Sequence, residues 1–213
     1  MLWILYVALE PEIRARWPHS IVTWNRLLAG RWKDPQVCSH ILVGSAVGII
    51  EWLGVEWIVW GGSGLEIARG TRHWIGGYAG ALAHVLIAAF ALSLIVFTIK
   101  PLVKKHLLAA VLAAAIAVFF NFGDRPAQSL QHWQLIAAYF GLFAILIFVL
   151  LRLGLVAFCA AIFFANSANN IIVGAGWTTW YAPYGLATLA MLLGIALFAF
   201  WRSLGSRELL GPE

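Results

Sequence analysis

Apolar residues along this chain are grouped into six long runs, separated by short polar or glycine-containing segments. Most of these runs reach the length of about 20 residues that an α-helix needs to cross a bilayer, and the third is close to the lower limit. Strands of a membrane β-barrel alternate apolar and polar residues over about ten positions, and these runs are continuous instead. The pattern predicts an all-α, polytopic integral membrane bundle of about six transmembrane helices, at approximately residues 39–60, 76–99, 106–121, 134–151, 153–173 and 183–201.

The longest polar passage of the chain, residues 10–34, comes before the first apolar run. Four apolar side chains recur in it at helical spacing: Ile21, Trp24, Leu27 and Leu28. This spacing predicts a short amphipathic helix that lies in the headgroup layer of the membrane and ends near Gly30. We therefore divide the chain into an N-terminal part, 1–38, and a six-helix membrane domain with a short tail, 39–213.

The first nine residues are apolar but too few to span a membrane. As a helix they would cover about 14 Å, under half of a roughly 30 Å hydrocarbon core. They also lack the basic start and the small-residue cleavage site of a signal peptide. We interpret them as the inner end of a helix whose outer half is missing, or as a half-inserted anchor, and expect the chain to be truncated at its N-terminus.

Composition and charge predict where the protein is located and how it is oriented. Hydrophobic residues make up 62% of the chain and charged residues 11%, whereas soluble domains have about 45–50% and about 25%. Eleven of the 14 Lys and Arg residues fall before the first run or in connections on that same side, and three fall on the other side. This asymmetry predicts a bacterial cytoplasmic (inner) membrane protein with the segment before Ser39 and the C-terminus in the cytoplasm. The basic residues form no continuous face, so no nucleic-acid partner is expected.

Basic and aromatic residues of the amphipathic passage are expected to contact membrane lipids. The alternative for this surface is an acidic protein partner. The residues concerned are Arg14, Arg16, Trp17, Trp24, Arg26, Arg31, Trp32 and Lys33.

Both ends of the chain resemble a recurring bacterial sequence. The matching segments are Ala8–Pro11, Arg14, Arg16–Pro18, Ser20–Gly30 and Asp34-Pro35, and then Trp180–Ala182 and Ser203–Gly205. They are similar to the C-terminal membrane region of certain bacterial serine/threonine protein kinases, notably acidobacterial ones, and of kinase-free relatives. In that family Asp-Pro is usually followed by Leu-Val-Gly-Arg-Asp, whereas this chain has Gln36–His40 there. The resemblance implies a membrane domain and no particular reaction, and the kinase motifs are missing from this sequence.

The first apolar run carries two acidic side chains. Glu51 falls near its middle and Glu56 near its outer end. An ionised carboxylate at mid-bilayer costs on the order of 2.5–3.5 kcal/mol, so Glu51 should face protein or water. Two interpretations stay open: a neutral, hydrogen-bonded carboxyl that holds helices together, or the centre of a proton or cation relay.

His84 is the only histidine well inside a predicted span. A buried imidazole can ligate the metal of a haem or a chlorophyll through a ring nitrogen. Small residues around it, Gly77, Gly80, Ala81 and Ala88, leave room for a flat ring but equally permit close packing of helices. Pigment or haem ligation and a hydrogen-bonded packing role therefore both stay open.

Three shorter motifs carry weaker signals. A polar patch, Asn166, Ser167, Asn169 and Asn170, occupies the outer part of the fifth run. It marks the place where a span leaves the lipid or contacts a neighbour, or it interrupts the helix to line a cavity, as in transporters. Gly44 and Gly48, four residues apart, favour close helix packing. Gly61–Gly64 matches the G-x-S-G pattern of intramembrane serine proteases, but its place in an outer loop is typical of a turn.

The function that follows is a hypothesis. We expect a non-enzymatic, lipid-binding membrane module that anchors, senses for or assembles with other membrane proteins or with copies of itself. The alternative is an auxiliary subunit of a photosynthetic or respiratory complex that binds a pigment or haem through His84. A third is a small-solute or proton transporter that uses Glu51. The sequence has no zinc-ligand spacing, dinucleotide fingerprint or phosphate loop.

Overall fold

The computed structural model describes residues 18–59, 70–103, 106–122, 130–171 and 182–204. These ranges contain seven helices and no strand. The helices are α2 (Pro18–Leu28), α3 (Pro35–Val59), α4 (Thr71–Leu102), α5 (His106–Phe122), α6 (Leu130–Leu153), α7 (Leu155–Ala168) and α8 (Ala182–Ser203). Each of the six apolar runs forms one helix, α3 to α8, so the predicted all-α bundle is confirmed. Residues 1–17 lie outside the described part, and with them the prediction for the first nine residues.

Helix lengths differ more than the apolar runs suggest. Four helices, α3, α4, α6 and α8, are long and apolar enough to cross a membrane, and they indicate a membrane protein. The other two, α5 and α7, are shorter apolar helices. The predicted span at 153–173 is corrected most, because α7 has 14 residues and ends at Ala168, a length of about 21 Å.

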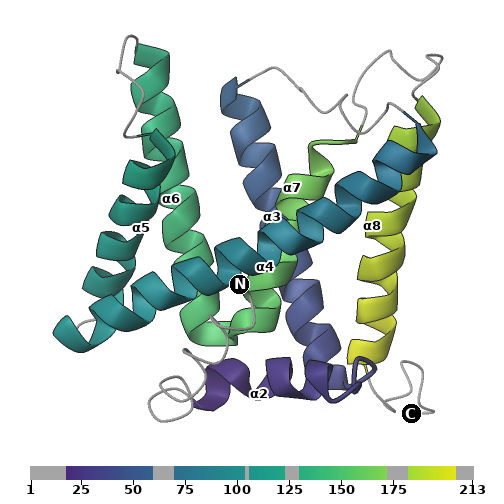
Figure 1. The fold of residues 1–213 in the computed structure, drawn as a ribbon, viewed down its shortest axis with the longest axis horizontal. Helices are drawn as coiled ribbons and strands as arrows, with labels where there is room; N and C mark the ends of the chain where they lie inside the picture. The colour runs from purple at the N-terminus through teal and green to yellow at the C-terminus, as the bar shows by residue number, and fades with distance from the viewer. Residues whose placement is uncertain (1–17, 60–69, 104–105, 123–129, 172–181, 205–213) are drawn as a thin grey trace, which may run out of the picture.

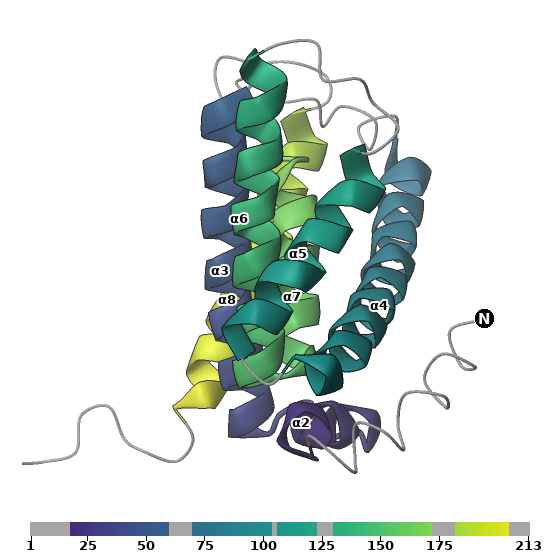
Figure 2. The same cartoon turned by 90° about the vertical axis from the view of Figure 1, so that its left-hand side faces the viewer.

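The helices α3, α7 and α8 stand side by side, and α6 and α5 continue the bundle from α7 (Figure 1). The long helix α4 runs obliquely across one side, against α5 and α7. The short helix α2 lies across one end of the bundle, crosswise to α3 (Figures 1 and 2). We call this the α2 end; it also holds the start of α3 and the last turn of α8.

The closest contact in the bundle joins α3 to α7. A Cβ atom at Gly44 would collide with the carbonyl oxygen of Ala157, and one at Gly48 would collide with that of Ala161 and lie 3.0 Å from the Cβ of Phe164. The two helices therefore run in the same direction with their backbones in contact, which only glycine permits. The close packing predicted from Gly44 and Gly48 is confirmed.

Candidate functional site

The amphipathic helix ends as its glycine predicts. Gly30 has a φ of 75°, and its N–H donates to the carbonyl of Leu27 (3.0 Å), while the N–H of Arg31 donates to that of Arg26 (2.9 Å). This pair of bonds is the Schellman arrangement, in which a residue with positive φ closes a helix. The chain then turns sharply from α2 into α3.

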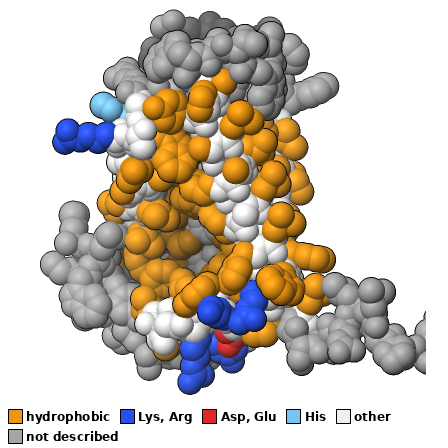
Figure 3. All heavy atoms as spheres, turned by 90° about the vertical axis from the view of Figure 1, so that its right-hand side faces the viewer, with side chains coloured by type: hydrophobic (Ala, Val, Ile, Leu, Met, Phe, Trp, Pro, Cys, Tyr) orange, Lys and Arg blue, Asp and Glu red, His pale blue; other side chains and the backbone are white. Residues whose placement is uncertain are grey.

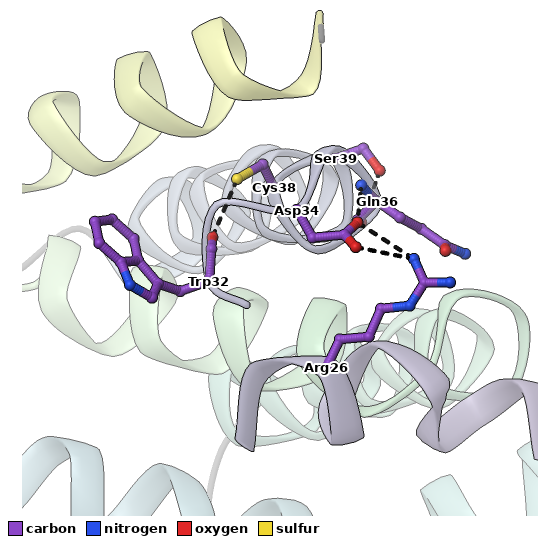
Figure 4. A network of polar contacts seen from close by, with 6 residues as sticks. All are labelled: Arg26, Trp32, Asp34, Gln36, Cys38 and Ser39. Carbon is purple, nitrogen blue, oxygen red and sulfur yellow. Dashed lines mark hydrogen bonds and ion pairs between the residues drawn. The ribbon is translucent and has the colours of Figure 1, made fainter. Parts of the chain in front are cut away.

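Asp34 holds that turn in place (Figure 4). Its Oδ1 accepts the N–H of Gln36 at 2.9 Å, which caps the start of α3, and its Oδ2 lies 3.1 Å from Nη1 of Arg26 on α2. The prediction from the sequence missed this role of Asp34, although an acidic residue followed by proline directly before an apolar run is the signal of a helix cap.

Trp32 connects the same turn to the last helix. Its ring stacks on Phe198 of α8, with centroids 5.5 Å apart and planes at 27°. The Nζ of Lys33 lies 4.7 Å from the centre of the Trp32 ring. On the other side, the Sγ of Cys38 donates to the Trp32 carbonyl at 3.4 Å (Figure 4). The turn is therefore attached to α3 and to α8 as well as to α2.

The predicted lipid- or partner-contacting residues differ in how far they are exposed. Arg14, Arg16 and Trp17 lie outside the described residues. Arg31, Trp32 and Lys33 are exposed, as a contacting surface requires, and Arg26 is partly buried in its ion pair.

Trp24 corrects the expectation, because it is only 8% exposed. Its ring packs edge-to-face on Phe90 of α4, with centroids 5.8 Å apart. Trp24 and Leu27 thus face the bundle, whereas Leu28 is 59% exposed.

Glu51 and Ser167 each bury an oxygen atom without a hydrogen-bond partner among the described residues. They lie one helical turn beyond the contact of Gly48 with Phe164, Glu51 on α3 and Ser167 on α7. Residues three positions apart share a helix face, so Glu51 and Ser167 lie on the sides of α3 and α7 that carry this contact. Glu56 also lies in α3, but its side chain is outside the described part.

His84 lies on the exposed side of α4 and not inside the bundle. The expectation of a buried imidazole is therefore wrong. A Cβ atom at Gly80, one turn earlier, would meet nothing within 4 Å. A pigment or haem ligated by His84 would have to lie on the outer surface of α4, because α4 turns its opposite side to α5 and α7.

The polar patch at the end of α7 forms the end of that helix. Asn169 is its C-cap residue, and the backbone N–H of Asn170 donates to the carbonyl of Ser167 at 3.0 Å. Asn166 and Asn169 are exposed and Asn170 is half-buried. The helix α7 stops at this patch, as both an ending span and an interrupted helix require, so the two interpretations stay open.

A polar contact between α4 and α8 escaped sequence reasoning. Nε1 of Trp74 donates to Oγ1 of Thr188 at 3.2 Å, and the hydroxyls of Tyr78 and Thr188 are 2.8 Å apart. Thr188 in turn donates to the carbonyl of Tyr184 within α8 (2.9 Å). These residues are more than 100 positions apart in the sequence, and nothing in the local sequence pairs them.

Groups of three or more potential metal ligands do not occur within the described ranges. The G-x-S-G segment, Gly61–Gly64, lies outside them. No protein-family model, curated protein or solved structure matches the chain. The resemblance to the membrane region of bacterial kinases stays a prediction.

Proposed function

We propose that the chain is a non-enzymatic integral membrane module that assembles with partner proteins, or with copies of itself, in a bacterial inner membrane. The observation that supports this proposal is an exposed helix face that contains small residues. It consists of five exposed residues on one side of α4, which we call the open α4 face: Gly76, Gly80, Ala83, His84 and Ile87.

Another helix of the same chain already packs through a face of this kind. On α3, helix α7 packs directly against Gly44 and Gly48. On α4, a Cβ atom at Gly76 or Gly80 would have no neighbour within 4 Å among the described residues. Small residues let a second helix approach closely, and histidine can donate a hydrogen bond across the contact. A histidine left against lipid is costly, so a partner helix would stabilise His84.

Site-specific photo-crosslinking in native membranes tests this proposal. A photoreactive amino acid at Ala83 or Ile87 should give a protein adduct of one defined mass. Leu193 and Leu197, which are exposed on α8, are the matched controls. Adducts with lipid alone at all four positions would contradict assembly through α4. An absorption spectrum of the same sample tests for a pigment or haem at His84, which would absorb above 400 nm.

A second candidate function is proton or cation transfer through Glu51. It is favoured by the buried oxygens of Glu51 and Ser167, which have no hydrogen-bond partner among the described residues and lie one helical turn beyond the contact of Gly48 with Phe164. Flux into liposomes should then fall in Glu51→Gln and, by a smaller factor, in Ser167→Ala. Flux that is unchanged in Glu51→Gln would eliminate this candidate and leave the carboxyl as an internal contact.

A further inference from the structure

We propose that the α2 end carries a binding site for the phosphate of an anionic phospholipid. The site is the corner between the α2–α3 turn and the last turn of α8. Its cations are Arg31, Lys33 and Arg202, and its aromatic floor is the stack of Trp32 on Phe198. This site is separate from the open α4 face, so it does not depend on the proposed function.

The stack is what brings the three cations to one place. Arg31 and Lys33 flank Trp32 in the sequence, and Nζ of Lys33 already lies over the Trp32 ring. Arg202 follows Phe198 by four residues, which is one turn along the same side of α8.

These cations have no internal counter-charge among the described residues. Asp34 is the carboxylate at this corner, and Arg26 occupies both of its oxygens, at 3.1 and 3.3 Å. Glu51, the next described carboxylate along α3, lies about 24 Å further along the helix axis. Arg31, Lys33 and Arg202 are all exposed, so a bound anion can contact them without breaking an ion pair between described residues.

An apolar wall rises directly beside the basic corner. Figure 3 shows Lys and Arg side chains gathered at one end of this face and hydrophobic side chains covering the surface next to them. On α8, Leu197 and Trp201 are 65% and 74% exposed. The site therefore offers cations for the phosphate of a phospholipid, an indole ring for the membrane interface and an apolar surface for the acyl chains. A soluble anion would use the cations but not the wall.

Native mass spectrometry of the full chain, released from detergent, tests the site. Phosphatidylglycerol should bind in preference to phosphatidylcholine, and the triple variant Arg31→Gln/Lys33→Gln/Arg202→Gln should lose about tenfold or more in affinity for phosphatidylglycerol. The charge-retaining variant Arg31→Lys/Lys33→Arg/Arg202→Lys should keep most of it. Equal binding of the two lipids, or no loss in the triple variant, would overturn the proposal.

Two further experiments distinguish lipid binding at this site from general electrostatic attraction of lipid to basic residues. Arg152→Gln, at the end of α6, removes an exposed cation that lies over Phe148, and it should leave the affinity unchanged. A loss as large as that of the triple variant would overturn a localised site. Inorganic phosphate at millimolar concentration should not displace the lipid; full displacement would show that a free anion, not a lipid, is the ligand. Thermal unfolding without added lipid checks that each variant is folded.

Discussion

Two segments of this protein have the same glycine spacing and opposite surroundings. Gly44 and Gly48 of α3 lie against the backbone of α7, so that even a methyl group at either position would collide with a carbonyl oxygen. Gly76 and Gly80 of α4 have nothing within 4 Å of the place where a Cβ atom would stand. Both helices are long and apolar enough to cross a membrane.

The difference shows that the spacing permits close approach but does not select a partner. Between apolar helices in lipid there is little hydrophobic force to prefer one face over another, and packing and hydrogen bonds decide. On α3 the partner is an internal helix. On α4 the internal contacts with α5 and α7 use other residues, which leaves the glycine side available.

The largest difference is expected between Gly48→Ala and Gly80→Ala. The first places a methyl group against the carbonyl of Ala161, which a helix backbone cannot move aside, and should lower the free energy of unfolding by about 1–3 kcal/mol. The second should be neutral or stabilising by up to about 1 kcal/mol, because alanine favours the helix. Unfolding in mixed detergent micelles measures both. Gly54→Ala, in open space on α3 itself, is the control; equal effects at all three sites would contradict the comparison.

A substitution at Thr188 tests whether α4 is held by a polar contact and not by its glycines. Thr188→Val keeps the shape of the side chain but removes the hydroxyl that Trp74 and Tyr78 both contact, at a cost of about 1–3 kcal/mol. Thr98→Val is the matched control, since that exposed hydroxyl only donates to the carbonyl of Leu94 in its own helix. A shift of the unfolding midpoint in Thr188→Val alone is the expected result, and similar shifts in both would refute the role of the contact.

The cap and the ion pair made by Asp34 stabilise the start of α3, the tightly packed helix of the two compared. Asp34→Ala removes the cap and the ion pair together, and should cost about 0.5–2 kcal/mol. Asp34→Asn keeps a capping oxygen and should cost less, as should Arg26→Gln, which removes only a partly exposed ion pair worth about 0–1 kcal/mol. Unfolding curves at low and high salt distinguish them, because only the ion-pair component is screened. An Asp34→Asn loss as large as that of Asp34→Ala would mean that the charge, not the cap, dominates.

The smallest effect is expected at His84. His84→Leu should change the free energy of unfolding of the isolated chain in detergent by about 0.5 kcal/mol or less, because the ring is exposed. In native membranes the same variant should weaken any complex made through the open α4 face. A large loss in the isolated chain would show that His84 has a partner within a single copy and that the α4 side is not open.

Much of the fold followed from local pattern. The apolar runs predicted six helices and their places, and Gly30 was correctly identified as the end of α2. The site was predicted less well. Arg31, Trp32 and Lys33 are exposed as expected, but Trp24 is inside and His84 outside. Both errors concern which side of a helix faces a neighbour. For His84, α4 is apolar on most sides, so the sequence period carries little of that information. For Trp24, the period identified the apolar side of the amphipathic helix α2 but not what covers that side.

The order and approximate bounds of the described helices follow from the sequence alone, because the length of an apolar run and the caps beside it are local properties. Three features depend on the tertiary structure: which glycine pair packs against a neighbouring helix, the ion pair of Asp34 with Arg26, and the contact of Trp32 with Phe198 on the last helix. These contacts join residues that are distant along the chain or separated by a sharp turn. Their geometry depends on how whole helices cross, and neither run length nor residue spacing specifies that.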